Sequence, residues 1–158
     1  MSKLKTVDIY QITPIIEELL SDGKDVRLTV VGNSMFPMLH SGTDSVVLTK
    51  PMAPLRKYDL PLYRRKTGEY VMHRIVKIND GYFTTNGDNQ YMLESPVYPD
   101  MIIAVVREFY RKGKKISCAS FWYKVYCVFW VNLRPFRGII SRTYRHTIGR
   151  IKSFLVRK

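Results

Sequence analysis

The sequence predicts a mainly β fold, a coiled and partly open β-barrel with a helix at each end. Apolar residues alternate with polar ones in several short central segments, whereas near both ends they recur every three or four residues. The central segments are too short, and their turns too frequent, for a parallel sheet. We therefore divide the chain into an N-terminal amphipathic helix (1–24), a β domain (25–116) and a helical tail (117–158).

The N-terminal segment has the spacing of one amphipathic helix. Isoleucine and leucine recur at helical intervals over residues 6–22, and Asp22-Gly23 supplies a stop signal. The segment is too short for a helix-turn-helix domain, so we do not expect it to read a DNA sequence. It also lacks the apolar run of a signal peptide or a membrane span. We therefore expect this end to be cytoplasmic.

Strands are expected where apolar and polar residues alternate. These segments are residues 26–30, 46–48, 60–63, 70–78, 82–85 and 101–109. Asn79-Asp80-Gly81 is a strong hairpin signal, which predicts that 70–78 pairs with 82–85. A basic turn at 111–115 is expected to follow the last strand.

Charge is distributed unevenly along the chain. The 26 Lys and Arg residues outnumber the 13 Asp and Glu residues, which gives a net charge of +13. Every acidic residue lies at or before Glu108, where basic residues balance them, so residues 109–158 carry the whole excess. A basic segment without acids fits an anionic partner, either a membrane surface or a nucleic acid.

The tail combines this charge with an apolar face. From Trp122 to Leu155, apolar residues recur at helical spacing, with a break expected near Pro135. Aromatic side chains suit the membrane interface and arginines suit anionic headgroups, so we favour peripheral membrane attachment, with a single span as the alternative. Nucleic acid is less expected, because the apolar face is too continuous for an arm lying on phosphates. The predicted membrane-binding residues are Trp122, Phe129, Trp130, Arg134, Arg137, Arg142 and Arg145.

Three short motifs carry the candidate chemistry. Residues 32–37 (GNSMFP) place Ser34 in a turn, residues 73–76 (HRIV) place His73 in a predicted strand, and residues 87–89 (GDN) follow. A hydroxyl becomes a useful nucleophile when a neighbouring base removes its proton, and an imidazole is largely unprotonated near neutrality. The two side chains are therefore a candidate nucleophile and general base.

Each motif also has a plainer interpretation. A Gly-Asn-Ser sequence is usually just a turn, and a histidine on a strand face is ordinarily a core residue. Asp88 follows a glycine and is more typical of a turn residue bonding nearby amides than of a charge partner, and Glu94 can equally be a solvated surface acid. The order of the three motifs along the chain favours the catalytic interpretation.

In this order and approximate spacing, the motifs resemble those of the type I signal peptidases and the self-cleaving SOS-type repressors, from about Arg27 to Val106. In that superfamily the nucleophile lies in a Gly-x-Ser-Met-x-Pro turn, which Ser34 matches. The base precedes an arginine and two aliphatic residues, which His73 matches. Histidine in place of lysine is similar to the endoplasmic-reticulum, archaeal and sporulation-type branch.

The resemblance implies a serine endopeptidase that cleaves leader or signal-like peptides through an acyl-enzyme, with the peptide added as a strand to an exposed barrel edge. It implies an acid that supports the histidine: Glu94 stands where an aspartate is usual, and Asp88 is the other candidate. Gly32, Ser34 and Met35 are expected to form the oxyanion site and substrate groove, with the Ser34 amide as donor. The chain departs from membrane-anchored peptidases, which have a spanning helix just before the serine.

No cofactor or metal is expected, because the two cysteines and three histidines lack ligand spacing. Two other functions stay open. A degenerate peptidase fold could act as a peptide-binding membrane adaptor, in which Ser34 and His73 are dispensable. A basic nucleic-acid-binding protein would show steep salt dependence on a DNA column and little affinity for anionic vesicles.

Overall fold

The computed structural model describes residues 9–136 and consists mainly of β-strands, with 34% strand against 24% helix, as predicted. The elements of this part of the chain, in order, are α1 (Ile9–Ser21), β1 (Val26–Thr29), β2 (Ser45–Thr49), β3 (Pro61–Arg64), β4 (Tyr70–Met72), β5 (Arg74–Ile78), β6 (Phe83–Asn86), β7 (Glu94–Val97), the 3-10 helix η1 (Pro99–Met101), β8 (Ile102–Arg111), β9 (Lys114–Ser117) and α2 (Phe121–Asn132).

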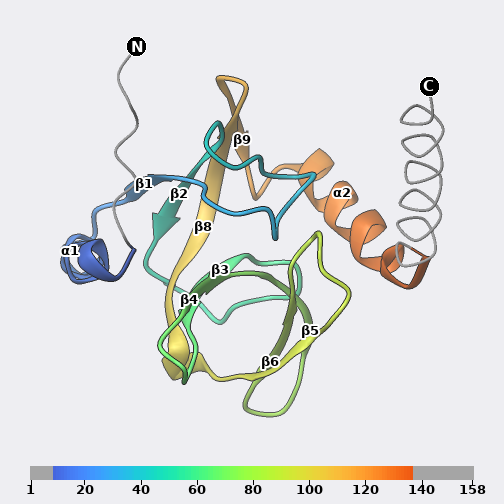
Figure 1. Cartoon of the computed structure of the whole chain (residues 1–158), viewed down its shortest axis with the longest axis horizontal. Coiled ribbons are helices and arrows are strands. Elements are labelled where there is room, and N and C mark those ends of the chain that lie inside the picture. Colours follow the sequence, from blue (N-terminus) through green and yellow to red (C-terminus); the bar gives the residue numbers. More distant parts are fainter. Residues whose placement is uncertain (1–8, 137–158) are drawn as a thin grey trace, which may run out of the picture.

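The larger sheet curls into a half-barrel (Figure 1). Its strands follow the order β1-β2-β8-β3-β4, β9 pairs with β8, and every pair is antiparallel. The register shifts between Val47 and Leu48 and between Leu62 and Tyr63, and such irregularities bend a strand and increase its twist. The bending curls the sheet so that β1 and β4 form its two edges.

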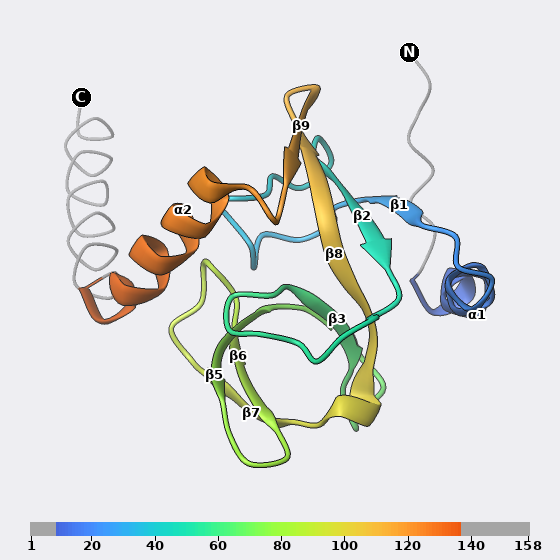
Figure 2. The ribbon, with the colours of Figure 1, turned by 180° about the vertical axis from the view of Figure 1, so that it is seen from behind.

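The smaller sheet has the order β5-β6-β7 within the described residues. β5 and β6 form the predicted hairpin around Asn79-Asp80-Gly81, with Ile78 opposite Phe83, so this prediction is confirmed. Figures 1 and 2, from opposite sides, both show this sheet facing β3 and β4 across a ring-like half of the molecule.

The predicted single strand over residues 70–78 is wrong. The chain pairs with β3 as far as Met72, breaks at His73, and continues as β5 in the other sheet. Apolar alternation runs through the break unchanged, which is why periodicity did not reveal it. The consequence is that His73 lies buried at the junction of the two sheets.

The buried hydrophobic side chains form one core cluster. Its buried side chains come from α1, the loop after β1, the central strands and α2. α1 contributes Ile16 and Leu20 and exposes Ile15, so the predicted amphipathic helix is confirmed within the described residues. It lies beside β1, at one edge of the sheet (Figure 1).

α2 begins after Ser120, whose hydroxyl caps the helix by accepting a hydrogen bond from the Tyr123 amide. The helix ends at Asn132, shortly before Pro135, where the sequence predicted a break. Between residues 9 and 136, no helix has the length and apolar character needed to cross a membrane. Three of the predicted membrane-binding residues, Arg137, Arg142 and Arg145, lie outside the described residues.

Candidate active site

Ser34 lies in the loop that follows β1. Gly32 has a φ of 93°, a left-handed conformation that favours glycine, and its amide donates to the Ser41 hydroxyl at 3.1 Å. Met35 is buried in the core and anchors the turn beneath the serine. The Gly32 amide is engaged, whereas the Ser34 amide forms no hydrogen bond within residues 9–136, so the Ser34 amide is the more available donor of the two.

The Gly-Asp-Asn motif holds this loop in place through the backbone. The Asn89 amide donates to the Ser34 carbonyl at 2.8 Å, and the Asn89 side chain donates to the Asn33 carbonyl at 3.2 Å. A Cβ atom on Gly87 would lie 2.8 Å from the Ser34 carbonyl oxygen. Glycine is therefore required at position 87 for the turn to approach the serine loop this closely.

Gly87→Ala is expected to displace the Ser34 loop. The added methyl group meets backbone, which cannot move aside as a flexible side chain would, so we expect a loss of roughly 1–3 kcal/mol of folding stability. Any activity that depends on Ser34, measured per folded molecule, should fall as well. Gly23→Ala, which adds the same group where nothing lies within 4 Å, is the control and should lower stability without lowering activity. Equal effects of both substitutions on activity would contradict this role of Gly87.

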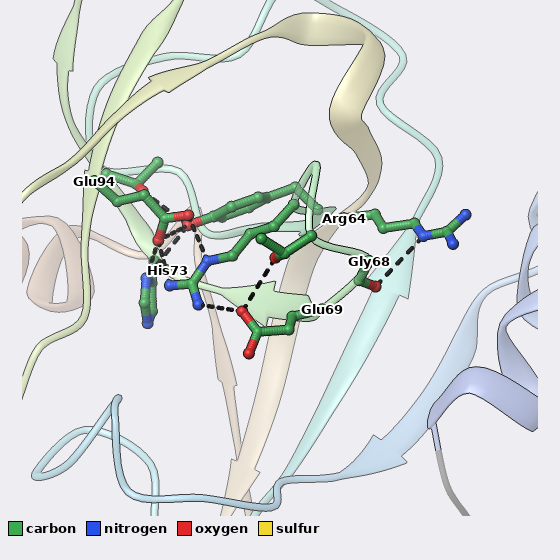
Figure 3. Close-up of polar contacts among 9 residues, drawn as sticks. Arg64, Gly68, Glu69, His73 and Glu94 are labelled. Atoms are coloured by element: carbon green, nitrogen blue, oxygen red, sulfur yellow. Dashed lines mark hydrogen bonds and ion pairs between the residues drawn. The ribbon is translucent and has the colours of Figure 1, made fainter.

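One ring nitrogen of His73 lies close to an acid and a phenol. Its Nδ1 lies 3.4 Å from Glu94 Oε2 and 3.3 Å from the Tyr63 hydroxyl. Figure 3 shows the other ring nitrogen pointing away from Glu94, on the side of the loop that follows β1. A carboxylate can only accept, so this environment favours a proton on Nδ1 and a free electron pair on Nε2.

Glu94 is held by stronger contacts than the one to His73. Arg65 donates to its two oxygens at 2.6 and 2.7 Å, and the Tyr63 hydroxyl donates to Oε2 at 2.8 Å (Figure 3). Burial alone would raise the pKa of the Glu94 carboxyl, but the bonds from Arg65 and Tyr63 outweigh it and hold this pKa below its usual value. Glu94 is therefore a carboxylate at neutral pH.

Burial also sets the protonation state of His73. Removal from water disfavours the charged imidazolium and lowers the pKa of His73 below 6.5, although the nearby Glu94 carboxylate works in the opposite direction. At neutral pH the ring is therefore neutral. A neutral imidazole with Nε2 unprotonated is the form that a general base requires.

Asp88, the other candidate acid, pairs with Arg74. The guanidinium donates from Nε to Asp88 Oδ1 at 2.9 Å and from Nη2 to Oδ2 at 2.7 Å, and both side chains are buried. Asp88 lies in a turn, as expected, and its side chain is in addition a charge partner of Arg74. Of the two candidate acids, the structure brings Glu94 to the imidazole.

Arg74 also ties three other parts of the molecule together. It donates to the Tyr58 carbonyl at 3.2 Å, to the Tyr123 hydroxyl and Cys127 sulfur of α2 at 2.9 Å each, and to the Met38 sulfur of the serine loop at 2.9 Å. Despite burial, Tyr123 and Asp88 keep the pKa of this guanidinium well above its usual value. Arg74, which directly follows His73 in the chain, therefore holds α2 and the Ser34 loop in place.

Ser34 and His73 line the same cavity, of about 780 Å³. Its walls come from both edges of the half-barrel: residues 27–32 on the β1 side and residues 70–73 on the β4 side. No hydrogen bond joins the Ser34 hydroxyl to His73 in the part of the chain that the structure describes. Catalytic hydrogen bonds are often long before substrate binds and tighten in the complex.

Sequence reasoning missed several residues of the site. Tyr63 and Arg65 come from β3 and the turn after it, Thr85 comes from β6, and Arg74 follows the histidine directly. The weak signal was the type of residue: a tyrosine in a predicted buried strand needs a partner for its hydroxyl, and so does an arginine on an apolar strand.

Neither a scan against protein-family models nor a search of curated proteins finds a match for this chain. Its function is therefore inferred from the chemistry of the site.

Proposed function

We propose that this protein is a serine endopeptidase of the signal-peptidase-like kind, which cleaves leader or signal-like peptides through an acyl-enzyme. The observation that supports this most is the arrangement of Ser34 and His73 on one cavity, with His73 Nδ1 turned to Glu94 and its other nitrogen turned away from it. The hydroxyl, base and acid then have the roles of nucleophile, general base and orienting group.

The chemical steps follow from these roles. His73 Nε2 takes the proton of the Ser34 hydroxyl as the oxygen attacks the scissile carbonyl carbon, and the Ser34 amide donates to the oxyanion that forms. The imidazolium, stabilised by the Glu94 carboxylate, gives its proton to the leaving amine as the peptide bond breaks. A water molecule then attacks the acyl-enzyme ester as His73 takes its proton. The bond to the Ser34 oxygen breaks, the imidazolium returns the proton to that oxygen, and the acid product leaves.

The groove suits an extended peptide. β1 and β4 are each two antiparallel pairings away from β8, so these two edge strands run in the same direction. The chain leads from the end of β1 to Ser34 and from the end of β4 to His73. A peptide placed between them can pair with the backbone of both edge strands. The cavity follows six residues from Arg27 to Gly32, which at about 3.3 Å each is roughly 20 Å of extended chain.

The lining of the groove favours an apolar peptide segment. Within the described part of the chain it consists mostly of apolar side chains, and Arg27 and Arg65 are its two charged residues. Arg65 is engaged by Glu94 and Glu69, and the Arg27 guanidinium lies over the Tyr110 ring at 3.8 Å. An apolar leader with polar residues at its ends therefore fits this site better than a strongly charged peptide does.

The proposal is tested by incubating the full chain with a panel of synthetic leader peptides and identifying products by mass. We expect one cleavage site per good substrate and an acyl-enzyme mass on Ser34. The adaptor alternative predicts peptide binding without products, with equal affinity for wild type and Ser34→Ala. That result would overturn the peptidase proposal.

We further propose peripheral association with an anionic membrane surface, which rests on the outer face of α2. Trp122 and Phe129 expose 78% and 62% of their surface, and Phe121 beside them is also exposed. Trp130 lies differently: its indole donates to the Asp88 carbonyl at 3.0 Å and stacks on Tyr126, so it belongs to the docked face. The exposed aromatic residues and the acid-free tail together suit an anionic bilayer interface.

Trp122→Ser combined with Phe129→Ser is expected to weaken binding to anionic vesicles by roughly 10²-fold to 10⁴-fold. The reason is that burying each large apolar side chain contributes about 1.5–3 kcal/mol. Vesicle sedimentation measures the change. Ile15→Ser with Met52→Ser, which removes two other exposed apolar side chains, is the control and should leave partitioning unchanged. Unchanged partitioning of the first variant would contradict the membrane proposal.

A further inference from the structure

Tyr63 is a buried tyrosine whose hydroxyl touches three groups of the site. It comes from β3, is fully buried, and lies 2.8 Å from Glu94 Oε2, 2.9 Å from the Thr85 hydroxyl and 3.3 Å from His73 Nδ1. Its ring meets the imidazole edge to face, with 6.3 Å between ring centres. The phenol therefore occupies the space between the acid and the histidine.

The donors and acceptors around this hydroxyl can all be matched. A phenol has one proton to donate and can accept two. Tyr63 donates to the Glu94 carboxylate, and it can accept from the Thr85 hydroxyl and from a proton on His73 Nδ1. If His73 carried its proton on Nε2 instead, Nδ1 would be an acceptor facing a carboxylate and a phenol whose only proton is already used.

The direct contact between Glu94 and His73 is weaker by comparison. Nδ1 and Oε2 are 3.4 Å apart, whereas Glu94 is held at 2.6–2.8 Å by Arg65 and Tyr63. Burial raises the pKa of the Tyr63 phenol far above its usual value, so its proton stays in place while the imidazole titrates. Tyr63 is therefore a constant donor to Glu94 and a constant acceptor toward Nδ1.

We infer that Tyr63 is a positioning residue for His73: its hydroxyl links the imidazole to Glu94, selects the tautomer with the proton on Nδ1, and so keeps Nε2 unprotonated toward the groove. This inference rests on the proposed function for its catalytic meaning. The geometry itself can be tested without activity, because the tautomer of a histidine is visible in nitrogen chemical shifts.

The test uses the full chain with 15N-labelled histidine at a pH above 7. In wild type, His73 should show a protonated Nδ1 and an unprotonated Nε2. In Tyr63→Phe it should show averaged shifts of the two tautomers, and kcat on a leader peptide should fall roughly tenfold to a hundredfold with KM nearly unchanged. Tyr123→Phe removes another buried hydroxyl, the one bound to Arg74, and should leave the His73 tautomer as in wild type.

The outcomes separate this inference from the peptidase proposal. A tautomer change in Tyr63→Phe without any peptidase activity in wild type would support the link to His73 and overturn the proposed function. An active enzyme whose tautomer and kcat are unaffected by Tyr63→Phe would overturn the inference alone. If Tyr63→Phe does not fold, wild type still decides, because a proton on Nε2 of His73 would overturn the inference.

Discussion

We expect alanine at position 34 or 73 to abolish peptide cleavage, and we expect the double variant to be no less active than either single variant. In the proposed mechanism Ser34 supplies the attacking oxygen and His73 supplies the base, so removal of either one ends the same step. Catalytic groups that act as a unit lose activity together, and we expect a fall of roughly 10⁴-fold or more in kcat. Product formation from a leader peptide, followed by mass spectrometry, measures it.

Matched substitutions elsewhere separate this effect from general damage. Ser21→Ala removes an exposed hydroxyl at the end of α1, and His40→Ala removes an imidazole that contacts Asp44 on the serine loop. Both should retain activity of the same order as wild type. Cleavage at equal rates by wild type, Ser34→Ala and His73→Ala would show that the pair has no catalytic role and would favour the adaptor function.

Arg74→Met has the largest expected effect on stability, a loss of about 3–5 kcal/mol. Removing one partner of a buried ion pair leaves the other charge without compensation, and both Arg74 and Asp88 are buried. The substitution also removes the bonds from Arg74 to Tyr123 and Cys127, so α2 should lose its main polar attachment. Urea unfolding of the full chain measures the change.

Two further variants give this prediction its controls. Arg107→Met breaks an exposed ion pair with Asp25 and should cost no more than about 1 kcal/mol. Replacing both buried partners, Arg74→Met with Asp88→Leu, should be less destabilising than Arg74→Met alone, since no buried charge is then left unpaired. If Arg74→Met costs no more than Arg107→Met, the buried pair is not the anchor that the structure indicates.

Local sequence patterns were sufficient to predict several helices and strands. The spacing of isoleucine and leucine predicted α1, because one face of a helix repeats every three to four residues. Asn79-Asp80-Gly81 predicted the β5–β6 hairpin, because that turn needs residues that tolerate positive φ, and Gly81 has a φ of 75°. Both signals depend on neighbours in the chain.

The break at His73 could not be predicted in this way. Alternation continues from β4 into β5, and what separates the two strands is the sheet in which each finds its partner. Strand β7 was also missed, because Glu94-Ser95-Pro96-Val97 is polar and contains a proline. Sheet membership depends on contacts distant in sequence.

The candidate site, too, was predicted only where local motifs were sufficient. Motif order suggested Ser34 and His73, and both line the same cavity. Motif order did not show which acid, Glu94 or Asp88, contacts His73. The answer depends on two long-range contacts: Asp88 pairs with Arg74, and β7 places Glu94 beside Tyr63 and Arg65. Likewise, the aromatic stretch grouped Trp130 with Trp122 and Phe129 as membrane-binding residues, whereas its indole donates a hydrogen bond to the Asp88 carbonyl.

Covalent labelling of Ser34 shows whether His73 activates its hydroxyl. A serine-directed phosphonate reacts with a serine that a neighbouring base has activated. We predict one label per chain, located at Ser34, at a rate that rises with pH to a plateau near neutrality. The midpoint should lie below 6.5, since burial lowers the pKa of His73, and His73→Ala should not be labelled. Absence of label at Ser34, or labelling at the same rate in His73→Ala, would contradict the account.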